Sequence, residues 1–279
     1  AVAAVASEAG ERVLCVPDVL AALQKLAHWA VGQWGGDIVA VTGSAGKTST
    51  KDLIAEMLSM GLPTGKTEGN LNNHIGIPLS VLRLDSGAQA AVLEYGMNHA
   101  GEIRELCAIA RPRIAVVTNV GAAHIENFDS IEGIAAAKRE LVEALPEGGI
   151  AVLNADDPRV AAFAGAHSGR SILYGLDAAA EVRAEDVEIK PDGFRFRVGT
   201  VTFETALSGL HSVRNILAGI AVASLYGIPA ERLTGVVRRL QPGKMRGERL
   251  EYRGIHIIND CYNSNPDAAK AMLDVLAAT

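Results

Sequence analysis

Hydrophobic residues in the middle of the chain form short continuous runs, and each run is followed by a segment with helical spacing. The runs at 38–41, 90–93 and 114–117 lack the polar alternation of a strand with one face in water. Such runs are typical of parallel strands that are buried on both faces. We therefore predict an α/β fold with a mostly parallel sheet and helices on both faces. The predicted strands are 37–42, 89–95, 113–119, 149–154 and 171–174, and the predicted helices between them are 46–59, 100–109, 131–144 and 158–164.

The pattern changes on both sides of this central block. Residues 182–206 alternate between apolar and polar positions and contain glycine turns, which predicts a small antiparallel appendage. The other predicted elements are a strand at 13–16, helices at 17–27, 211–226 and 230–240, a linker at 241–243, a strand at 255–260 and a helix at 267–278. We therefore predict three parts: an N-terminal remnant with a connecting helix (1–35), a central domain (36–243) and the start of a second α/β domain (244–279).

Composition excludes several partners. The chain has 279 residues, of which 49% are hydrophobic and 21% charged, as in ordinary globular proteins. Its net charge of −6, without a basic run, argues against nucleic acid or an anionic membrane as a partner. No apolar stretch has transmembrane length, and the start lacks the basic region of a signal peptide. Cys15, Cys107 and Cys261 are scattered, so we expect reduced thiols in a cytoplasmic protein.

A glycine-bearing turn joins the first strand of the central block to its helix. Its spacing, Gly-x-x-Gly-Lys-Thr, is two residues shorter than the usual phosphate-binding loop. Free N–H groups and the helix dipole at such a turn favour an anion. The spacing alone also fits a plain helix start, but its place between a buried strand and a helix favours nucleotide binding. The candidate nucleotide-binding residues are Gly43, Ser44, Ala45, Gly46, Lys47, Thr48 and Ser49.

Polar residues follow the next two strands at the same edge of the sheet, where open parallel sheets bind their ligands. Glu94 ends a buried run, and its carboxylate could hold Mg2+ or could be a solvated acid at a strand end. His124 follows the strand at 113–119 and is expected to face the same crevice, although a lone histidine is usually not a ligand. Lys138 lies on a helix that leads away from this edge, and its own spacing predicts an exposed lysine.

The segment 67–78 is dense in amides and glycines. Asn70, Asn72, Asn73 and His74 fall within five positions, which suits neither a core strand nor a helix interior. Asparagine supports turns, and side-chain amides pair well with sugar hydroxyls and carbonyls. A capped loop and a loop that binds a polar ligand therefore both fit this composition.

Taken together, these stretches resemble the Mur ligases, the ATP-dependent amide ligases of peptidoglycan precursor synthesis. The resemblance runs in family order from about residue 13 to the end of the chain. Gly-Asn-Leu-Asn-Asn at 69–73 and Tyr-Asn-Ser-Asn-Pro at 262–266 are far more specific than the phosphate-binding loop. They separate the branch that adds D-alanyl-D-alanine from the other Mur ligases. The further matching stretches are 94–98, 101–103, 118–124, 138–140, 152–157, 211–215 and 260–261.

The resemblance implies roles for individual residues. Lys47 would hold the ATP phosphates, and Thr48 and Glu94 would bind one Mg2+. His124 would serve a second metal position. Lys138 would react with CO2 to form a carbamate that helps to place Mg2+, which reverses its interpretation as an exposed lysine. The remaining assignments are Asn215 near the adenine and ribose, Arg246 and Asp260 reaching the nucleotide from the next domain, and Asn70, Asn72 and Asn73 lining the approach of the UDP-sugar peptide.

The implied reaction joins D-alanyl-D-alanine to UDP-N-acetylmuramoyl-tripeptide. The peptide carboxylate would attack the γ-phosphate of ATP to give an acyl phosphate, and the amine of D-alanyl-D-alanine would then displace phosphate. Lys47, Arg246 and two Mg2+ would neutralise the charge of the reactants. The sequence shows no general base. The alternatives are a related ligase that adds another amino acid and a nucleotide-binding module without turnover. We expect a monomer.

Departures from the family pattern affect both ends. Family members carry a fuller N-terminal domain that grips the UDP moiety and a complete C-terminal domain that closes over ATP. Because this chain does not start with Met and stops inside a predicted helix, we expect a fragment that is not fully active alone. The stretch 243–247 departs from the commoner Pro-Gly-Arg form, so either Lys244 or Arg246 could contact the nucleotide.

Overall fold

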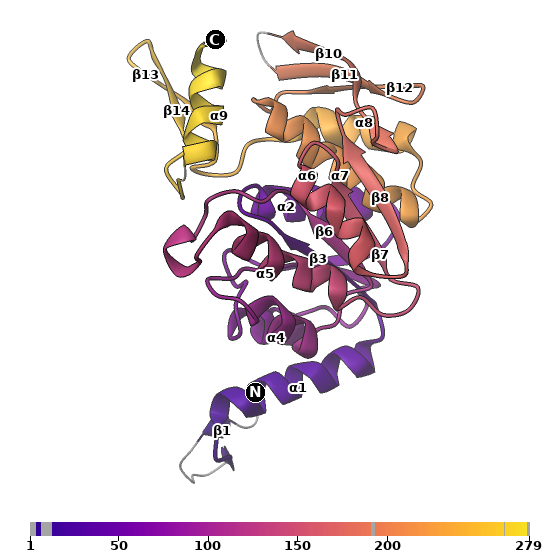
Figure 1. Ribbon diagram of the computed structural model, residues 1–279, viewed down its shortest axis with the longest axis vertical. Helices are drawn as coiled ribbons and strands as arrows, with labels where there is room; N and C mark the ends of the chain where they lie inside the picture. Colours follow the sequence, from indigo (N-terminus) through magenta and orange to yellow (C-terminus); the bar gives the residue numbers. More distant parts are fainter. Residues whose placement is uncertain (1–3, 7–12, 191–192, 265, 278–279) are drawn as a thin grey trace.

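A parallel sheet of seven strands forms the centre of the molecule (Figure 1). The computed structural model describes residues 4–6, 13–190, 193–264 and 266–277. All neighbouring strands of the central sheet run parallel, which confirms the predicted α/β class. In spatial order the strands are β4 (Thr64–Lys66), β5 (Ala90–Glu94), β3 (Asp37–Thr42), β6 (Ile114–Val117), β7 (Ile150–Asn154), β8 (Arg170–Gly175) and β9 (Val182–Arg183).

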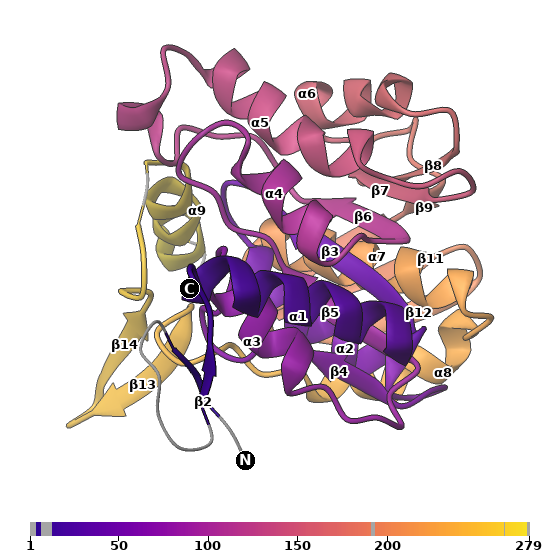
Figure 2. The ribbon, with the colours of Figure 1, turned by 90° about the horizontal axis from the view of Figure 1, so that it is seen from below.

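Helices cover both faces of this sheet (Figures 1 and 2). Successive side chains of a strand point to opposite faces, so β3 contributes Val39 and Val41 to one core and Ile38 and Ala40 to the other. This is why the strand sequences are continuously apolar. One core contains side chains of α2 (Lys47–Leu58), α7 (Leu210–Leu225) and α8 (Ala230–Arg239). The opposite core contains side chains of α1 (Val19–Trp34), α3 (Gly76–Leu82), α4 (Glu102–Ile109), α5 (Ile131–Glu143) and α6 (Pro158–Ala161).

The predicted antiparallel appendage is present as a separate three-stranded sheet. Its strands are β10 (Glu185–Lys190), β11 (Gly193–Val198) and β12 (Val201–Thr205). Phe196 and Phe203 stack with their ring centroids 5.5 Å apart and join the core beneath the appendage. The prediction was wrong at its start, because residues 182–183 pair with β8 as the edge strand of the parallel sheet.

Several short elements around the central sheet were not predicted, among them β4, α3 and a 3-10 helix, Ile125–Asn127. Strand β4 has three residues, too few to show an alternating pattern. Helix α3 begins inside the amide-rich segment 67–78, after its asparagines, and contains Pro78 in its first turn, where proline is tolerated because the N–H there has no helical partner. The predicted helix at 158–164 is α6 followed by a 3-10 helix, Ala162–Ala166.

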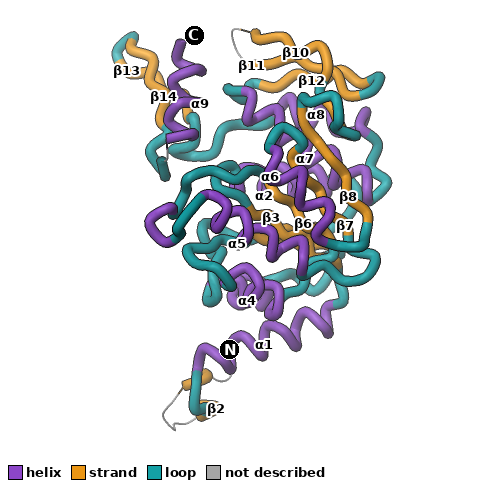
Figure 3. The backbone as a smooth tube through the Cα atoms, in the orientation of Figure 1, coloured by secondary structure: helices purple, strands orange, loops and turns teal. Residues whose placement is uncertain are grey.

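Smaller units flank the central sheet and its helices. At the N-terminal end, β1 (Ala4–Ala6) pairs in parallel with β2 (Val13–Cys15), ahead of α1. At the other end, β13 (Glu248–Tyr252) and β14 (Ile255–Asn259) form an antiparallel pair beside α9 (Pro266–Ala277) (Figure 1). The loop that follows α8 leads to this unit (Figure 3). Strand β13 had not been predicted, and Asn265 of the motif at 262–266 lies outside the described residues.

Candidate functional site

The loop between β3 and α2 has the backbone geometry of an anion site. Gly46 precedes the helix with φ 79°, a left-handed conformation that favours glycine. Neither a side-chain cap nor an acidic residue occupies the first turn of α2 as the structure describes it. The first N–H groups of the helix therefore remain available to an anion, and the positive end of the helix dipole points toward the loop.

The end of β6 fixes this loop in place. The Asn119 side chain accepts from the Ala45 N–H at 2.8 Å and donates to the Ala45 carbonyl at 3.0 Å. The Ser44 hydroxyl donates to the Gly121 carbonyl at 2.9 Å and accepts from the Gly121 N–H at 2.8 Å. The Ser44 side chain thus ties the loop to the next strand end, which holds the backbone N–H groups in a fixed arrangement.

Lys47 crosses the loop. Its Nζ donates to the Gly43 carbonyl at 2.8 Å. Burial lowers the pKa of the Lys47 ammonium, the carboxylate of Glu94 opposes this shift, and the charge of Arg246 adds to it. A cation that burial disfavours and that lies at the start of a helix is stabilised when an anion binds beside it.

Thr48 and Glu94 meet at the carboxyl edge of the sheet. The Thr48 hydroxyl donates to Glu94 Oε2 at 2.7 Å, and Asn72 Nδ2 donates to Glu94 Oε1 at 2.7 Å. Hydroxyl and carboxylate oxygens are the hard donors that Mg2+ prefers, and Mg2+ commonly uses one or two protein ligands together with phosphate oxygens. The described residues contain no group of three or more His, Cys, Asp or Glu that could hold a metal. The Thr48–Glu94 pair therefore fits Mg2+ that is held by two protein ligands together with phosphate oxygens.

His124 and Lys138 lie within electrostatic reach of Lys47. Burial, then Lys47 and then Lys138 lower the pKa of His124, while Glu126 and Glu102 raise it. The Lys138 side chain on α5 is only 2% exposed, so its interpretation from spacing as an exposed helix lysine was wrong. Burial, followed by the charge of Lys47, lowers the pKa of Lys138 well below its usual value. Both effects disfavour the ammonium form and so favour the neutral amine.

Arg246 reaches the site from the segment after α8. Its Nη2 donates to the Thr48 hydroxyl at 3.2 Å, and its guanidinium stacks on the Tyr262 ring at 4.0 Å from the centroid. Lys244 is exposed, so the geometry favours Arg246 as the residue that meets the loop. Asn215, on α7, is 7% exposed and lies beside Gly46, with its Oδ1 3.1 Å from the position a Cβ there would take.

The other predicted residues lie further from the loop. Asp260 sits near His211, where its charge raises the pKa of that histidine against the larger effect of burial. Asn73 accepts from the backbone N–H groups of Ile75 and Gly76, at 3.1 and 2.8 Å, and so caps α3. Asn70 is exposed. Of the three asparagines, only Asn72 contacts another candidate site residue, Glu94, in the described structure.

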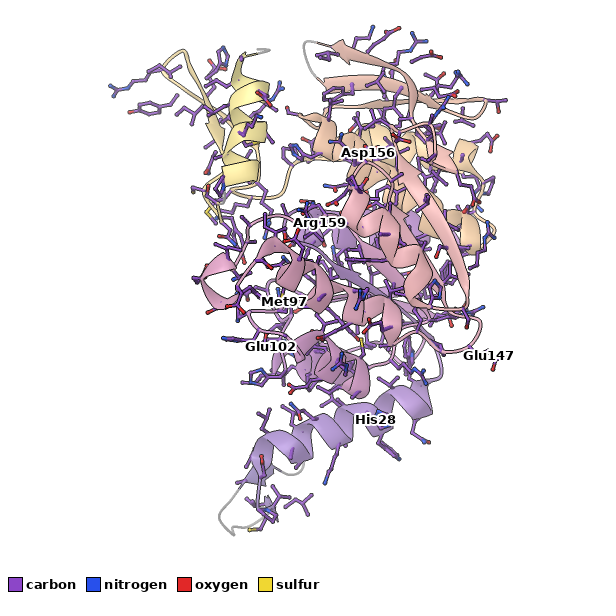
Figure 4. All side chains as sticks on the ribbon, viewed as in Figure 1. His28, Met97, Glu102, Glu147, Asp156 and Arg159 are labelled. Atoms are coloured by element: carbon purple, nitrogen blue, oxygen red, sulfur yellow. The ribbon has the colours of Figure 1, made fainter. Side chains whose placement is uncertain are left out.

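A partly buried ion pair that the sequence did not reveal ties three strand and helix ends together. Asp156, labelled in Figure 4, follows β7 and accepts from Arg214 Nε at 2.5 Å. Its other oxygen accepts from the N–H groups of Leu176 and Asp177, each at 2.8 Å. Because Arg214 precedes Asn215, this pair fixes the start of α7 beside the loop. Both residues fall in stretches that match the family, 152–157 and 211–215, but nothing in the sequence marked them as partners.

A glycine turn between a buried parallel strand and a helix, with a lysine, a hydroxyl and a facing carboxylate, defines an α/β protein with a phosphate-binding loop. The family model described as Mur ligase middle domain matches residues 41–223. The chain therefore belongs to the Mur ligase family. No helix in the described part of the chain combines the length and apolar character needed to cross a membrane.

Individual relatives agree with this assignment. The chain is 38% identical, over 269 residues, to UDP-N-acetylmuramoyl-tripeptide–D-alanyl-D-alanine ligase from Bacillus subtilis, an alignment that covers 94% of this chain and 58% of that one. The crystal structure of MurF from Acinetobacter baumannii superposes with a TM-score of 0.92 and 31% identity, covering 99% of this chain and 62% of that one. A MurF ligase from Thermotoga maritima in complex with ADP gives a TM-score of 0.89 and 29% identity. The chain thus spans about three fifths of the length of these relatives.

Proposed function

We propose that the protein is an ATP-dependent ligase that forms an amide bond between a peptide carboxylate and D-alanyl-D-alanine. The observation that carries this proposal is the Thr48–Glu94 pair beside Lys47 at the phosphate-binding loop. The relatives above, named for D-alanyl-D-alanine addition, support the substrate, and the Thermotoga maritima complex with ADP supports the nucleotide. UDP-N-acetylmuramoyl-tripeptide would be the carboxylate substrate.

Each residue of the loop region has a proposed task. The backbone N–H groups of residues 43–49 would bind the phosphates, and Lys47 would place its charge beside the outer ones. Thr48 and Glu94 would hold Mg2+, which when bound would neutralise phosphate charge and orient the γ-phosphate. Arg246, which donates to the Thr48 hydroxyl, would add a second cation from the segment after α8. Asn215 and Asp260 would contact the nucleoside, and Asn70, Asn72 and Asn73 would line the approach of the UDP-sugar peptide.

Lys138 and His124 would serve a second Mg2+ position. The lowered pKa of Lys138 supports a neutral amine that can add to CO2, forming an N–C bond and releasing one proton to give a carbamate anion. That anion would lie among the positive charges of Lys47 and a metal, where the ammonium form is disfavoured. In NMR with 13C-labelled bicarbonate we expect a carbamate signal that is lost in Lys138→Met. An unchanged signal in the variant would contradict the assignment.

The chemistry needs positioning and charge neutralisation more than proton transfer. The carboxylate oxygen of the peptide forms a bond to the γ-phosphorus, and the bond to the β,γ-bridging oxygen breaks to release ADP. The amine then attacks the acyl carbon, the acyl–oxygen bond breaks, and phosphate leaves while the amine loses a proton. Both reactants of the first step are anions, so Lys47 and Arg246 would lower its barrier by offsetting their repulsion.

The other features of the proposal concern the whole protein. Residues 1–35 and 244–279 would belong to flanking domains, and 36–243 would form the central ATP-binding domain. The cytoplasm supplies both ATP and UDP-linked sugars, so we place the protein there, as a monomer.

A phosphate-release assay tests the substrate assignment. It is run on a protein that carries this chain together with both flanking domains at the length of its relatives. With ATP and the UDP-linked tripeptide, we expect release that depends on D-alanyl-D-alanine and stops when a single amino acid replaces it. Release with another amine would instead favour a related ligase of the same family. Binding of ATP without acyl phosphate formation would favour a nucleotide-binding module. Glu94→Gln, which keeps the shape but removes the charge of the carboxylate, is the matched control and should abolish release.

A further inference from the structure

A second lysine of α2 is buried outside the phosphate-binding loop. Lys51 is 2% exposed, although it carries a charge and lies on a helix whose first turn faces the site. Its Nζ donates to the Thr67 carbonyl at 2.7 Å, and Asp52 Oδ1, on a half-exposed side chain, lies 3.3 Å away. Burying an ammonium is unfavourable unless it is paired and hydrogen-bonded, so the bond to Thr67 largely determines where this side chain sits.

Thr67 links this lysine to the candidate metal ligand. Thr67 is fully buried, and its N–H donates to the Val92 carbonyl at 3.0 Å. Its hydroxyl accepts from the Glu94 N–H at 3.1 Å. A continuous path therefore runs from the Lys51 ammonium to the Thr67 carbonyl, and from the Thr67 hydroxyl to the backbone N–H of Glu94.

Helix α2 holds Glu94 at two points. Residues three apart lie on the same face of a helix, so Thr48 and Lys51 both face β5. Thr48 bonds the Glu94 carboxylate directly, at 2.7 Å, while Lys51 fixes the Glu94 backbone through Thr67. Asn72, which donates to the other carboxylate oxygen, follows Thr67 in the same connection. Lys51 thus anchors the start of the loop whose amide orients that carboxylate.

We propose that Lys51 is a positioning residue that sets the Glu94 carboxylate against the Thr48 hydroxyl. This inference rests on the proposed function, because it assumes that the pair binds Mg2+. In the described structure the hydrogen-bond and ion-pair partners of the Lys51 side chain are Thr67 and Asp52, which belong neither to the phosphate-binding loop nor to the metal pair. Loss of Lys51 should therefore weaken the metal and leave the binding of metal-free nucleotide intact.

The test separates those two quantities in Lys51→Met, which keeps an unbranched side chain one atom shorter and removes its donor. One titration measures the Kd of a non-hydrolysable ATP analogue in EDTA. A second measures the Kd of Mn2+ by electron paramagnetic resonance with the analogue present. We expect the variant to bind the metal about tenfold more weakly, the effect of one hydrogen bond to a charged group. Its affinity for metal-free analogue should match that of the parent.

Three further variants, at Thr67 and Asp52, keep the inference testable when Lys51→Met fails to fold. Thr67→Val removes the hydroxyl that accepts from Glu94 and should reproduce the loss of metal affinity, whereas Thr67→Ser should restore it. Asp52→Asn removes the half-exposed carboxylate that pairs with both Lys51 and Lys66 but keeps the bond from Lys51 to Thr67, so it should change neither Kd. A slower amide exchange rate at Glu94 in the parent than in Thr67→Val would support the same path.

Each outcome bears on a different claim. Equal losses of metal and nucleotide affinity in Lys51→Met, or no loss of either, would overturn the positioning role. A parent chain that binds the analogue in neither titration would overturn the proposed nucleotide site and, with it, this inference.

Discussion

Replacing Gly43 by alanine should be the most damaging single change in the phosphate-binding loop. Gly43 has φ 153°, a conformation that residues with a Cβ rarely adopt. An added Cβ would overlap the Thr118 hydroxyl and would lie 3.1 Å from the Thr118 Cβ and 3.2 Å from the Asn119 nitrogen. Thr118 is 2% exposed, and its hydroxyl donates to the Ala45 carbonyl at 2.7 Å, so it cannot move aside without breaking that bond.

The magnitude follows from three contributions. Backbone strain costs about 1–2 kcal/mol, overpacking about 1–3 kcal/mol, and the lost Thr118 hydrogen bond about 1 kcal/mol. We therefore expect Gly43→Ala to lower the free energy of unfolding by about 4 kcal/mol. Gly69→Ala is the matched control, because Gly69 also has positive φ, 54°, but an added Cβ there meets no atom within 4 Å. It should cost only the strain, about 1 kcal/mol.

Urea unfolding of both variants measures this difference, provided that the denaturant slopes agree. A double variant with Thr118→Ala should recover part of the loss, because the overlapping hydroxyl is then absent. A Gly43→Ala chain no less stable than Gly69→Ala would refute the steric argument.

Three further predictions concern charged groups. Lys138→Met, in bicarbonate-free buffer, should stabilise the fold by about 1–3 kcal/mol at pH 7. The lowered pKa of Lys138 means that the folded parent binds fewer protons than the unfolded chain. The gain in the variant, measured by urea unfolding, should therefore shrink as the pH rises toward 10.5, and a pH-independent gain would contradict this. Asp156→Asn should cost about 2 kcal/mol on urea unfolding, against almost nothing for Glu132→Gln, whose partner Arg159 is exposed. Arg246→Lys should weaken Mg-nucleotide binding about fivefold in calorimetry by losing its aromatic stack.

The sequence predicted the central sheet well because its strands are buried on both faces. Continuous apolar runs at 38–41 and 114–117 distinguish such strands from loops, and the glycine turn after the first run located the phosphate-binding loop. Strand β4 escaped prediction because its three residues depend on pairing with β5 for their conformation. Strand β9 escaped because two residues that pair at an edge have no pattern of their own.

Burial of charged residues was the part of the site that local spacing could not predict. Lys138 lies on a helix whose composition suits an exposed lysine, yet the fold encloses it. Only the family resemblance pointed to it beforehand. Lys51 is likewise a helical lysine that the fold buries, and no residue near it in sequence indicates its contact with Thr67. Such contacts depend on which strands are neighbours in the sheet. Helical periodicity carries no information about that spatial order.

The central claim is that Lys47 and its loop bind the phosphates of a magnesium nucleotide. Calorimetric titration of the chain and of Lys47→Ala with Mg2+ and a non-hydrolysable ATP analogue tests it most directly. The account predicts saturable binding by the parent and a loss of binding in the variant that leaves its thermal unfolding nearly unchanged. Equal binding by both chains, or no binding by either, would contradict it.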